Sequence, residues 1–224
     1  MHRPDLRLIV ITDAALAAPR SVIDVVRDCL EAGAPAVQLR DKHATARELY
    51  DQATALRTLT REFGALLFIN DRLDVALAAG ADGVHVGPHD VPLASLRNAV
   101  PRGFLIGGST DDPEIARRLE REGASYIGCG AVFGTKTKTD IGDERIGTDG
   151  LKRVVEATSL PVVAIGGITV ENASEAKAAG AAGVAVVSAL MKAPAPGVVV
   201  RALLSTLPRE ASVVAERNRG QEQV

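Results

Sequence analysis

Two aspartates in this sequence follow neighbouring apolar runs, at positions where strands would end. Asp71 comes directly after one run, and Asp90 follows the next. Two carboxylates on adjacent loops could hold Mg²⁺, which prefers oxygen ligands and often also takes phosphate oxygens and water. His85 lies between them and is interpreted as a hydrogen-bonded wall residue, because Mg²⁺ prefers oxygen to nitrogen. The alternative for Asp71 is a cap on the following helix, with Asp74 in the first helical turn.

An amide and two cations alternate along another run. Gln38 and Arg40 are two residues apart, so on a strand they face the same way, and Lys42 continues their line just past it. If that face points inward, these groups converge where an anionic ligand could bind. The alternative turns Arg40 and Lys42 toward solvent or pairs them with Asp41.

The segment 128–140 places glycines before threonines that alternate with lysines. Hydroxyl and ammonium groups beside glycines suit a phosphate, which requires several donors and positive charge at close range. No regular structure is predicted before about residue 148, and connections of that length are usually lids, binding loops or disordered segments. Taken alone, the segment is better explained as a solvated polar loop.

These polar residues lie at the ends of short apolar runs that alternate with amphipathic segments. The first run, 8–12, is rich in β-branched residues and apolar on both faces, which is typical of a buried parallel strand. The predicted strands are 8–12, 36–40, 65–69, 83–86, 104–107, 125–127, 162–165 and 183–187. The predicted helices are 21–31, 45–63, 72–79, 93–99, 113–121, 149–157, 170–179 and 198–207. Alternation of this kind predicts an α/β fold, a (β/α)8 TIM barrel, with a doubly wound open sheet as the alternative.

In a TIM barrel the loops after the strands build one active site. The acidic and basic residues of units two to four would then lie on one side of the barrel mouth. On the other side would lie Gly166-Gly167 and Val187-Ser188, which end the last two strands where this fold frequently binds phosphate. Two tight turns that need glycine are the alternative for that side. One site with two phosphate regions suggests a transferase that joins two phosphorylated small molecules.

Composition limits the other possibilities. The chain has 224 residues, 46% of them hydrophobic, a formal net charge of −2 and few aromatic residues, which argues against nucleic acid or an anionic membrane as a partner. Asp5 and Arg7 before the first apolar run argue against a signal peptide or a membrane span. Two distant cysteines form no metal motif and fit a reducing cytoplasm. We predict a cytoplasmic protein with one catalytic domain, 1–207, and a polar tail, 208–224, that frays; a homo-oligomer is left open.

Taken together, the motifs closely resemble thiamine-phosphate synthase over about residues 8–207. The combination is specific, although no single motif is. The motifs, in chain order, are Gln38-Leu39-Arg40-Asp41-Lys42, Asn70-Asp71, Asp82-Gly83-Val84-His85-Val86-Gly87 with Asp90, Ser109, Thr135-Lys136-Thr137-Lys138, Ile165-Gly166-Gly167-Ile168 and Val187-Ser188.

The resemblance implies a Mg²⁺-dependent TIM barrel that joins a hydroxymethylpyrimidine diphosphate to a thiazole phosphate and releases diphosphate. In that family the C–O bond breaks first, and the thiazole nitrogen captures the resulting carbocation. The resemblance implies that Asp71 and Asp90 bind the metal, and that Arg40, Ser109 and Lys138 are catalytic. It implies pyrimidine diphosphate contacts from Gln38, Leu39, Arg40, Asp41, Lys42, Asn70, Ser109 and Lys138. It implies thiazole phosphate contacts from Thr135, Lys136, Thr137, Gly167, Val187 and Ser188, with the Thr-Lys segment closing to exclude water.

Three positions depart from the family's pattern. Ile9 stands where tyrosine is common, Pro88 where glutamine is common, and Asp111 where histidine often follows Ser-Thr. None is an implied metal or diphosphate ligand, so we expect them to affect wall packing and substrate affinity.

Three other functions compete with this hypothesis. A thiazole tautomerase of the same superfamily would have little use for the acidic pair together with the cations. A phosphosugar isomerase or epimerase would need an acid–base pair at the mouth. A non-catalytic phosphate-ligand-binding barrel would bind either substrate without turnover.

Overall fold

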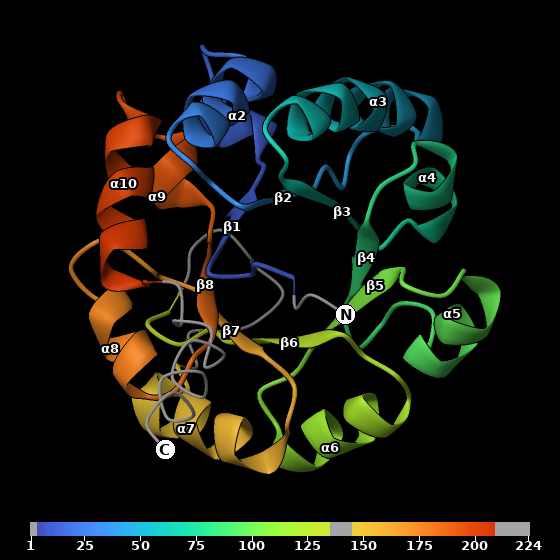
Figure 1. The fold of residues 1–224 in the computed structure, drawn as a ribbon, viewed down its shortest axis with the longest axis vertical. Helices are drawn as coiled ribbons and strands as arrows, with labels where there is room; N and C mark the ends of the chain where they lie inside the picture. The colour runs from blue at the N-terminus through green and yellow to red at the C-terminus, as the bar shows by residue number, and fades with distance from the viewer. Residues whose placement is uncertain (1–3, 135–144, 209–224) are drawn as a thin grey trace, which may run out of the picture.

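The computed structural model describes residues 4–134 and 145–208, and it confirms the predicted TIM barrel (Figure 1). Eight parallel strands close in sequence order, with the last strand hydrogen-bonded to the first. The strands are β1 (Leu8–Ile11), β2 (Ala36–Leu39), β3 (Leu66–Asn70), β4 (Gly83–Val86), β5 (Leu105–Ser109), β6 (Tyr126–Cys129), β7 (Val162–Ile165) and β8 (Gly183–Val186). The alternative of an open sheet is therefore excluded.

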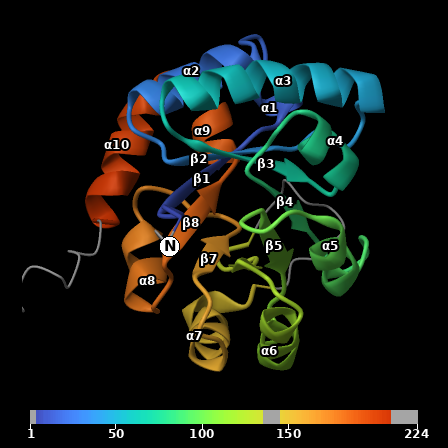
Figure 2. The same ribbon diagram turned by 45° about the vertical axis from the view of Figure 1, so that its right-hand side comes forward.

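Helices surround the barrel on its outside (Figure 1). They are α1 (Ala14–Ala17), α2 (Val22–Glu31), α3 (Ala46–Glu62), α4 (Leu73–Ala78), α5 (Leu93–Ala99), α6 (Pro113–Arg121), α7 (Gly147–Ala157), α8 (Ala173–Ala178), α9 (Ser188–Met191) and α10 (Pro196–Thr206). Figures 1 and 2 both place α10 beside α2, so the last helix closes the ring. Within the described ranges, no helix has both the length and the apolar character needed to cross a bilayer.

Local sequence explains where several helices begin. The side chain of Ser21 accepts a hydrogen bond from the Asp24 amide at the start of α2, and Thr45 forms a capping box with Glu48 at the start of α3. The predicted helix from residue 170 begins later, at Ala173, because Asn172 Oδ1 accepts from the Thr169 amide and forms a turn first. The four-residue helices α1 and α9 were not predicted, because they are too short to show a helical period.

Strand residues alternate between two cores, which explains why the strands are apolar on both faces. Leu8 and Val10 pack outward in the larger core between strands and helices, whereas Ile9 and Ile11 belong to the smaller core inside the barrel. Inside the barrel, residues of the same parity on each strand share the interior. This parity decides which polar residues reach the mouth.

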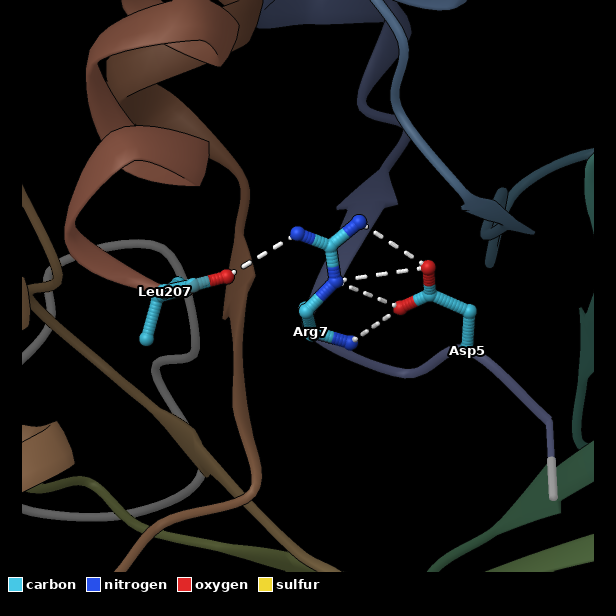
Figure 3. A network of polar contacts seen from close by, with 3 residues as sticks. All are labelled: Asp5, Arg7 and Leu207. Carbon is cyan, nitrogen blue, oxygen red and sulfur yellow. Dashed lines mark hydrogen bonds and ion pairs between the residues drawn. The ribbon is translucent and has the colours of Figure 1, made fainter. Parts of the chain in front are cut away.

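The Arg7 side chain joins the two ends of the described chain (Figure 3). Arg7 Nε lies 3.0 Å from Asp5 Oδ1, and Arg7 Nη1 donates to the Leu207 carbonyl oxygen at 3.0 Å. Leu207 follows the last turn of α10, where carbonyl groups lack partners within the helix. Arg7 therefore fastens the end of the last helix beside the first strand.

Candidate active site

A cavity of about 280 Å³ opens where the strands end, at the mouth of the barrel. Ten of the residues predicted from the sequence line it: Gln38, Arg40, Lys42, Asn70, Asp71, Asp90, Ser109, Gly167, Val187 and Ser188. Residues from both halves of the chain therefore meet in one site, as the barrel prediction requires.

Two predicted site residues do not line this cavity. The Leu39 side chain is 1% exposed and belongs to the outer core. The Asp41 carboxylate accepts hydrogen bonds from the backbone amides of His43 and Ala44 and from the Gln52 side chain, so it shapes the turn after β2. A contact between substrate and Leu39 or Asp41 would have to use their backbone groups. The predicted ligands Thr135, Lys136, Thr137 and Lys138 lie outside the described residues.

Arg40 lies one residue past β2, although the sequence predicted it inside the strand. Its backbone amide donates to Thr12 Oγ1 at 2.9 Å, so a side chain replaces the next bond of the strand ladder. Arg40 and Gln38 both line the cavity, as their spacing predicted, and Lys42 joins them. Arg40 is half-buried, whereas Lys42 lines the cavity and is also exposed to solvent, as the alternative expected for it.

Asp71 and Asp90 face each other on this side of the cavity. A hydrogen bond joins their carboxyl groups, and burial together with the Asp90 carboxyl raises the pKa of Asp71 to about 6, against the opposing charges of Lys42 and Arg40. Asp90 Oδ2 also accepts the Gly87 amide at 2.7 Å. A cation bound between the two acids could take the place of the proton on Asp71.

The backbone holds Asp71 in an uncommon conformation. Its φ of 63° is left-handed, and its amide donates to the His85 carbonyl oxygen at 2.8 Å. The helix-cap alternative for Asp71 is wrong, because Arg72 occupies the cap position of α4 and makes no side-chain cap bond. Asp74 does lie in the first turn, where it pairs with Arg72. Strain of this kind clusters at functional sites, which supports a site role for Asp71.

The donors present suit Mg²⁺. Within residues 4–134 and 145–208, no cluster of three or more His, Cys, Asp or Glu side chains could hold a metal. Mg²⁺ does not need such a cluster, since it is usually bound through one or two carboxylates plus water and substrate phosphate oxygens. Asp71 and Asp90 supply the two carboxylates of that requirement.

His85 is a hydrogen-bonded wall residue, as predicted. Its Nδ1 lies 2.9 Å from Tyr126 Oη, and its Nε2 lies 2.7 Å from Ser109 Oγ. Tyr126 is a functional candidate that was not predicted from the sequence, because a tyrosine in an apolar strand looks like an ordinary core residue.

Glycines form the opposite side of the cavity. Gly166 and Gly167 have φ angles of 93° and 67°, which favour glycine. A Cβ atom on Gly167 would lie 2.3 Å from the Gly134 carbonyl oxygen, so glycine is required there on steric grounds as well. The Phe133 amide donates to the Gly166 carbonyl oxygen at 3.0 Å. The backbone after β6 is thus fastened to the turn after β7.

Apolar residues complete the wall. Ile9 and Pro88, two of the departures from the family pattern, line the cavity, whereas Asp111 does not. Further lining residues that were not predicted as site residues are Ile11, Gly87, His89, Tyr126, Gly128, Gly130, Ala131, Val163, Ile165, Ile168, Ala185 and Val186. Strand parity could have found the inward members of this set, because every second residue of a barrel strand faces the interior.

The closed (β/α)8 barrel places this chain in the class of TIM-barrel enzymes. An acidic pair, two cations and glycine turns at the mouth are the groups that suit phosphorylated ligands. The family model described as thiamine monophosphate synthase matches residues 8–190. The chain belongs to this family. This finding confirms the resemblance and the transferase class that were predicted from the sequence.

Individual relatives agree with the family assignment. The thiamine-phosphate synthase of Pyrococcus abyssi is 48% identical over 85% of this chain and 89% of its own length. That of Natronomonas pharaonis is 47% identical over 86% of this chain and 90% of its own length. A solved structure, the thiamine phosphate pyrophosphorylase from Pyrococcus furiosus, has a TM-score of 0.83 and 42% identity, and the match covers 92% of this chain and 96% of that one.

Proposed function

We propose that this chain is a Mg²⁺-dependent thiamine-phosphate synthase. It would transfer the hydroxymethylpyrimidine group from its diphosphate to the nitrogen of the thiazole phosphate, giving thiamine phosphate and diphosphate. The observation that supports this most directly is the division of one cavity into two sides. Asp71, Asp90, Arg40 and Lys42 lie on one side, and the glycine turn lies on the other.

The proposed reaction begins when the bond between the pyrimidine methylene carbon and the diphosphate oxygen breaks. The electron pair leaves with the diphosphate, and the pyrimidine ring stabilises the remaining carbocation. The lone pair of the thiazole nitrogen then forms the new C–N bond. No general base is needed in this sequence, so the protein acts by positioning and by stabilising charge.

The residues on the side with Asp71, Asp90 and the two cations would stabilise the charge on the departing diphosphate. Arg40 and Lys42 would bind the departing diphosphate, and Arg40 can donate to two phosphate oxygens at once. Asp71 and Asp90 would hold Mg²⁺, which when bound neutralises further charge on the phosphates. Asn70, Gln38 and Ser109 supply polar contacts from the strand ends nearby.

The remaining wall would protect the carbocation and place its acceptor. Ile9, Val163 and Ala185 line the cavity from inside the barrel, where apolar side chains keep water from the reacting carbon. Gly167 and Ser188 lie after β7 and β8 and would hold the thiazole phosphate, the usual phosphate position of this fold.

The geometry favours this function over its rivals. An isomerase would need an acid–base pair, which only His85 and the carboxylates at the mouth could supply, and both ring nitrogens of His85 already bond to Tyr126 and Ser109. A thiazole tautomerase would have little use for an acidic pair beside two cations.

One experiment tests the proposal. Purified protein is mixed with both substrates, with Mg²⁺ or with a chelator, and thiamine phosphate and diphosphate are measured. We expect equal amounts of the two products with Mg²⁺ and none with the chelator. Absence of product with Mg²⁺ would refute the synthase, and binding of either substrate without turnover would favour a non-catalytic barrel. Product in the presence of the chelator would refute the metal requirement.

A further inference from the structure

Four polar side chains form a connected row across the floor of the cavity. They come from four strands: Gln38 from β2, Tyr126 from β6, His85 from β4 and Ser109 from β5. The Tyr126 hydroxyl lies 2.9 Å from His85 Nδ1, and His85 Nε2 lies 2.7 Å from Ser109 Oγ. Gln38 interacts with the Tyr126 hydroxyl and lowers its pKa against the rise that burial causes. Tyr126 is 1% exposed and Gln38 is 4% exposed. A buried polar group without a hydrogen-bond partner destabilises the folded state, so the mutual contacts in this row are a specific part of the structure.

The strand register explains how the row crosses β5. Gly107 pairs with His85 on one neighbouring strand and with Tyr126 on the other. A Cβ atom on Gly107 would lie 2.2 Å from Tyr126 Cζ and 2.4 Å from His85 Nδ1. A Cβ atom on Gly128 would lie 2.9 Å from His85 Cε1. Glycine weakens a strand, and here it leaves the space in which the two rings meet.

A neutral His85 bears its proton on one ring nitrogen or the other, which gives two arrangements of these hydrogen bonds. In the first, Tyr126 donates to His85 Nδ1, and His85 Nε2–H donates to Ser109 Oγ. The Ser109 proton is then left to point into the cavity that Ser109 lines. In the second, every donor is reversed, and Ser109 presents only lone pairs to the cavity.

The first arrangement suits both ends of the row. The Tyr126 hydroxyl is buried, and donation to His85 Nδ1 gives its proton a partner. At the other end, a diphosphate oxygen requires a donor, and a hydroxyl that faces it with lone pairs would repel it.

We propose that Tyr126 is a positioning residue that holds His85 in the tautomer protonated at Nε2 and thereby makes Ser109 a hydrogen-bond donor to the pyrimidine diphosphate. The tautomer is a property of the free protein. The effect on Ser109 rests on the proposed synthase function.

The test compares Tyr126→Phe with Tyr50→Phe. The chain has two tyrosines, and Tyr50 lies on α3 with 37% of its surface exposed, so it is a matched control. Tyr126→Phe removes one oxygen and keeps the ring, which packs edge-on against Phe68 with centroids 5.4 Å apart. Nitrogen-15 spectra report which nitrogen of His85 bears the proton. We expect Nε2–H in the wild type and in Tyr50→Phe, and a mixture or the other tautomer in Tyr126→Phe.

Kinetics show whether Tyr126 acts through Ser109. We expect Tyr126→Phe to lower kcat/KM for the pyrimidine diphosphate by roughly tenfold, the effect of one lost hydrogen bond, and to leave KM for the thiazole phosphate unchanged. Ser109→Ala should cause a loss of similar size. Adding Tyr126→Phe to Ser109→Ala should cause no further loss, because the two residues act as one unit.

Two results would overturn the proposal. An Nδ1–H tautomer in the wild type would do so by itself, whether or not Tyr126→Phe folds and whether or not the protein makes thiamine phosphate. Losses that multiply in the double variant would show that Tyr126 acts through general packing. If the wild type makes no thiamine phosphate but His85 is protonated at Nε2, the proposed function fails while the tautomer assignment stands.

Discussion

A hydrogen bond joins the carboxyl groups of Asp71 and Asp90, which follow different strands of the barrel. The left-handed backbone of Asp71, with φ 63°, and the amide of Gly87, which donates to Asp90, fix the two acids in this arrangement. A carboxyl group that bears a proton, as Asp71 does below its raised pKa, binds a metal only after that proton leaves. The affinity of the proposed site for Mg²⁺ should therefore depend on pH.

Affinity for Mg²⁺ should fall as the pH drops through about 6, where the raised pKa of Asp71 lies. Because the pKa is raised, the proton stays on the acid up to that pH, and Mg²⁺ must displace it. Titration calorimetry in buffers of different ionisation enthalpy should show proton release below this pKa and little release well above it. Asp71→Asn should weaken binding and abolish the release. Equal Mg²⁺ affinity on both sides of the pKa would contradict the assignment.

Arg40→Ala should reduce turnover by about 100-fold and raise KM for the pyrimidine diphosphate, since it removes a donor to the leaving group. Steady-state kinetics with each substrate varied in turn measure both effects. The control is Arg47→Ala, which removes an exposed arginine on α3 that pairs with Asp51. Similar kinetics in the two variants would exclude Arg40 from the diphosphate site.

Gly167→Ala should weaken binding of the thiazole phosphate by more than its backbone strain explains. Gly64→Ala is a close control, because Gly64 has a φ of 66° against 67° at Gly167, but a Cβ atom added there would meet no atom within 4 Å. Both variants should lose about 1 kcal/mol of unfolding free energy from backbone strain. At Gly167 the new methyl group also meets the Gly134 carbonyl oxygen. Calorimetric binding that is unchanged in Gly167→Ala would argue against this phosphate position.

Asp82→Ala should lower the free energy of unfolding by about 3 kcal/mol, because it leaves a largely buried arginine without its partner. Asp82 accepts from Arg57 at 2.7 Å and 3.0 Å and from the Leu67 amide at 2.8 Å. Arg57 Nε already has no hydrogen-bond partner among the described residues. Urea unfolding measures the loss, with Asp51→Ala at an exposed ion pair as the control. Equal denaturation midpoints for the two variants would contradict this prediction.

Local patterns were enough to predict the barrel and most of its polar mouth. The β-branched run that became β1 indicated a buried parallel strand, and Thr45 with Glu48 marked the start of α3. The spacing of Gln38 and Arg40 placed both on the inward face. These features depend on neighbours within a few residues, so the sequence contains them directly.

The sequence by itself determined the fold, the family and the residue types gathered at the strand ends. Only the tertiary structure decided that Asp71 meets Asp90 and does not cap α4, that Asp41 shapes a turn, and that Leu39 packs in the outer core. It also decided that Tyr126 joins His85 across Gly107, a contact between residues 41 positions apart. The physical reason is that closing a barrel brings every second residue of all its strands into one interior, and the register between neighbouring strands sets which of them touch.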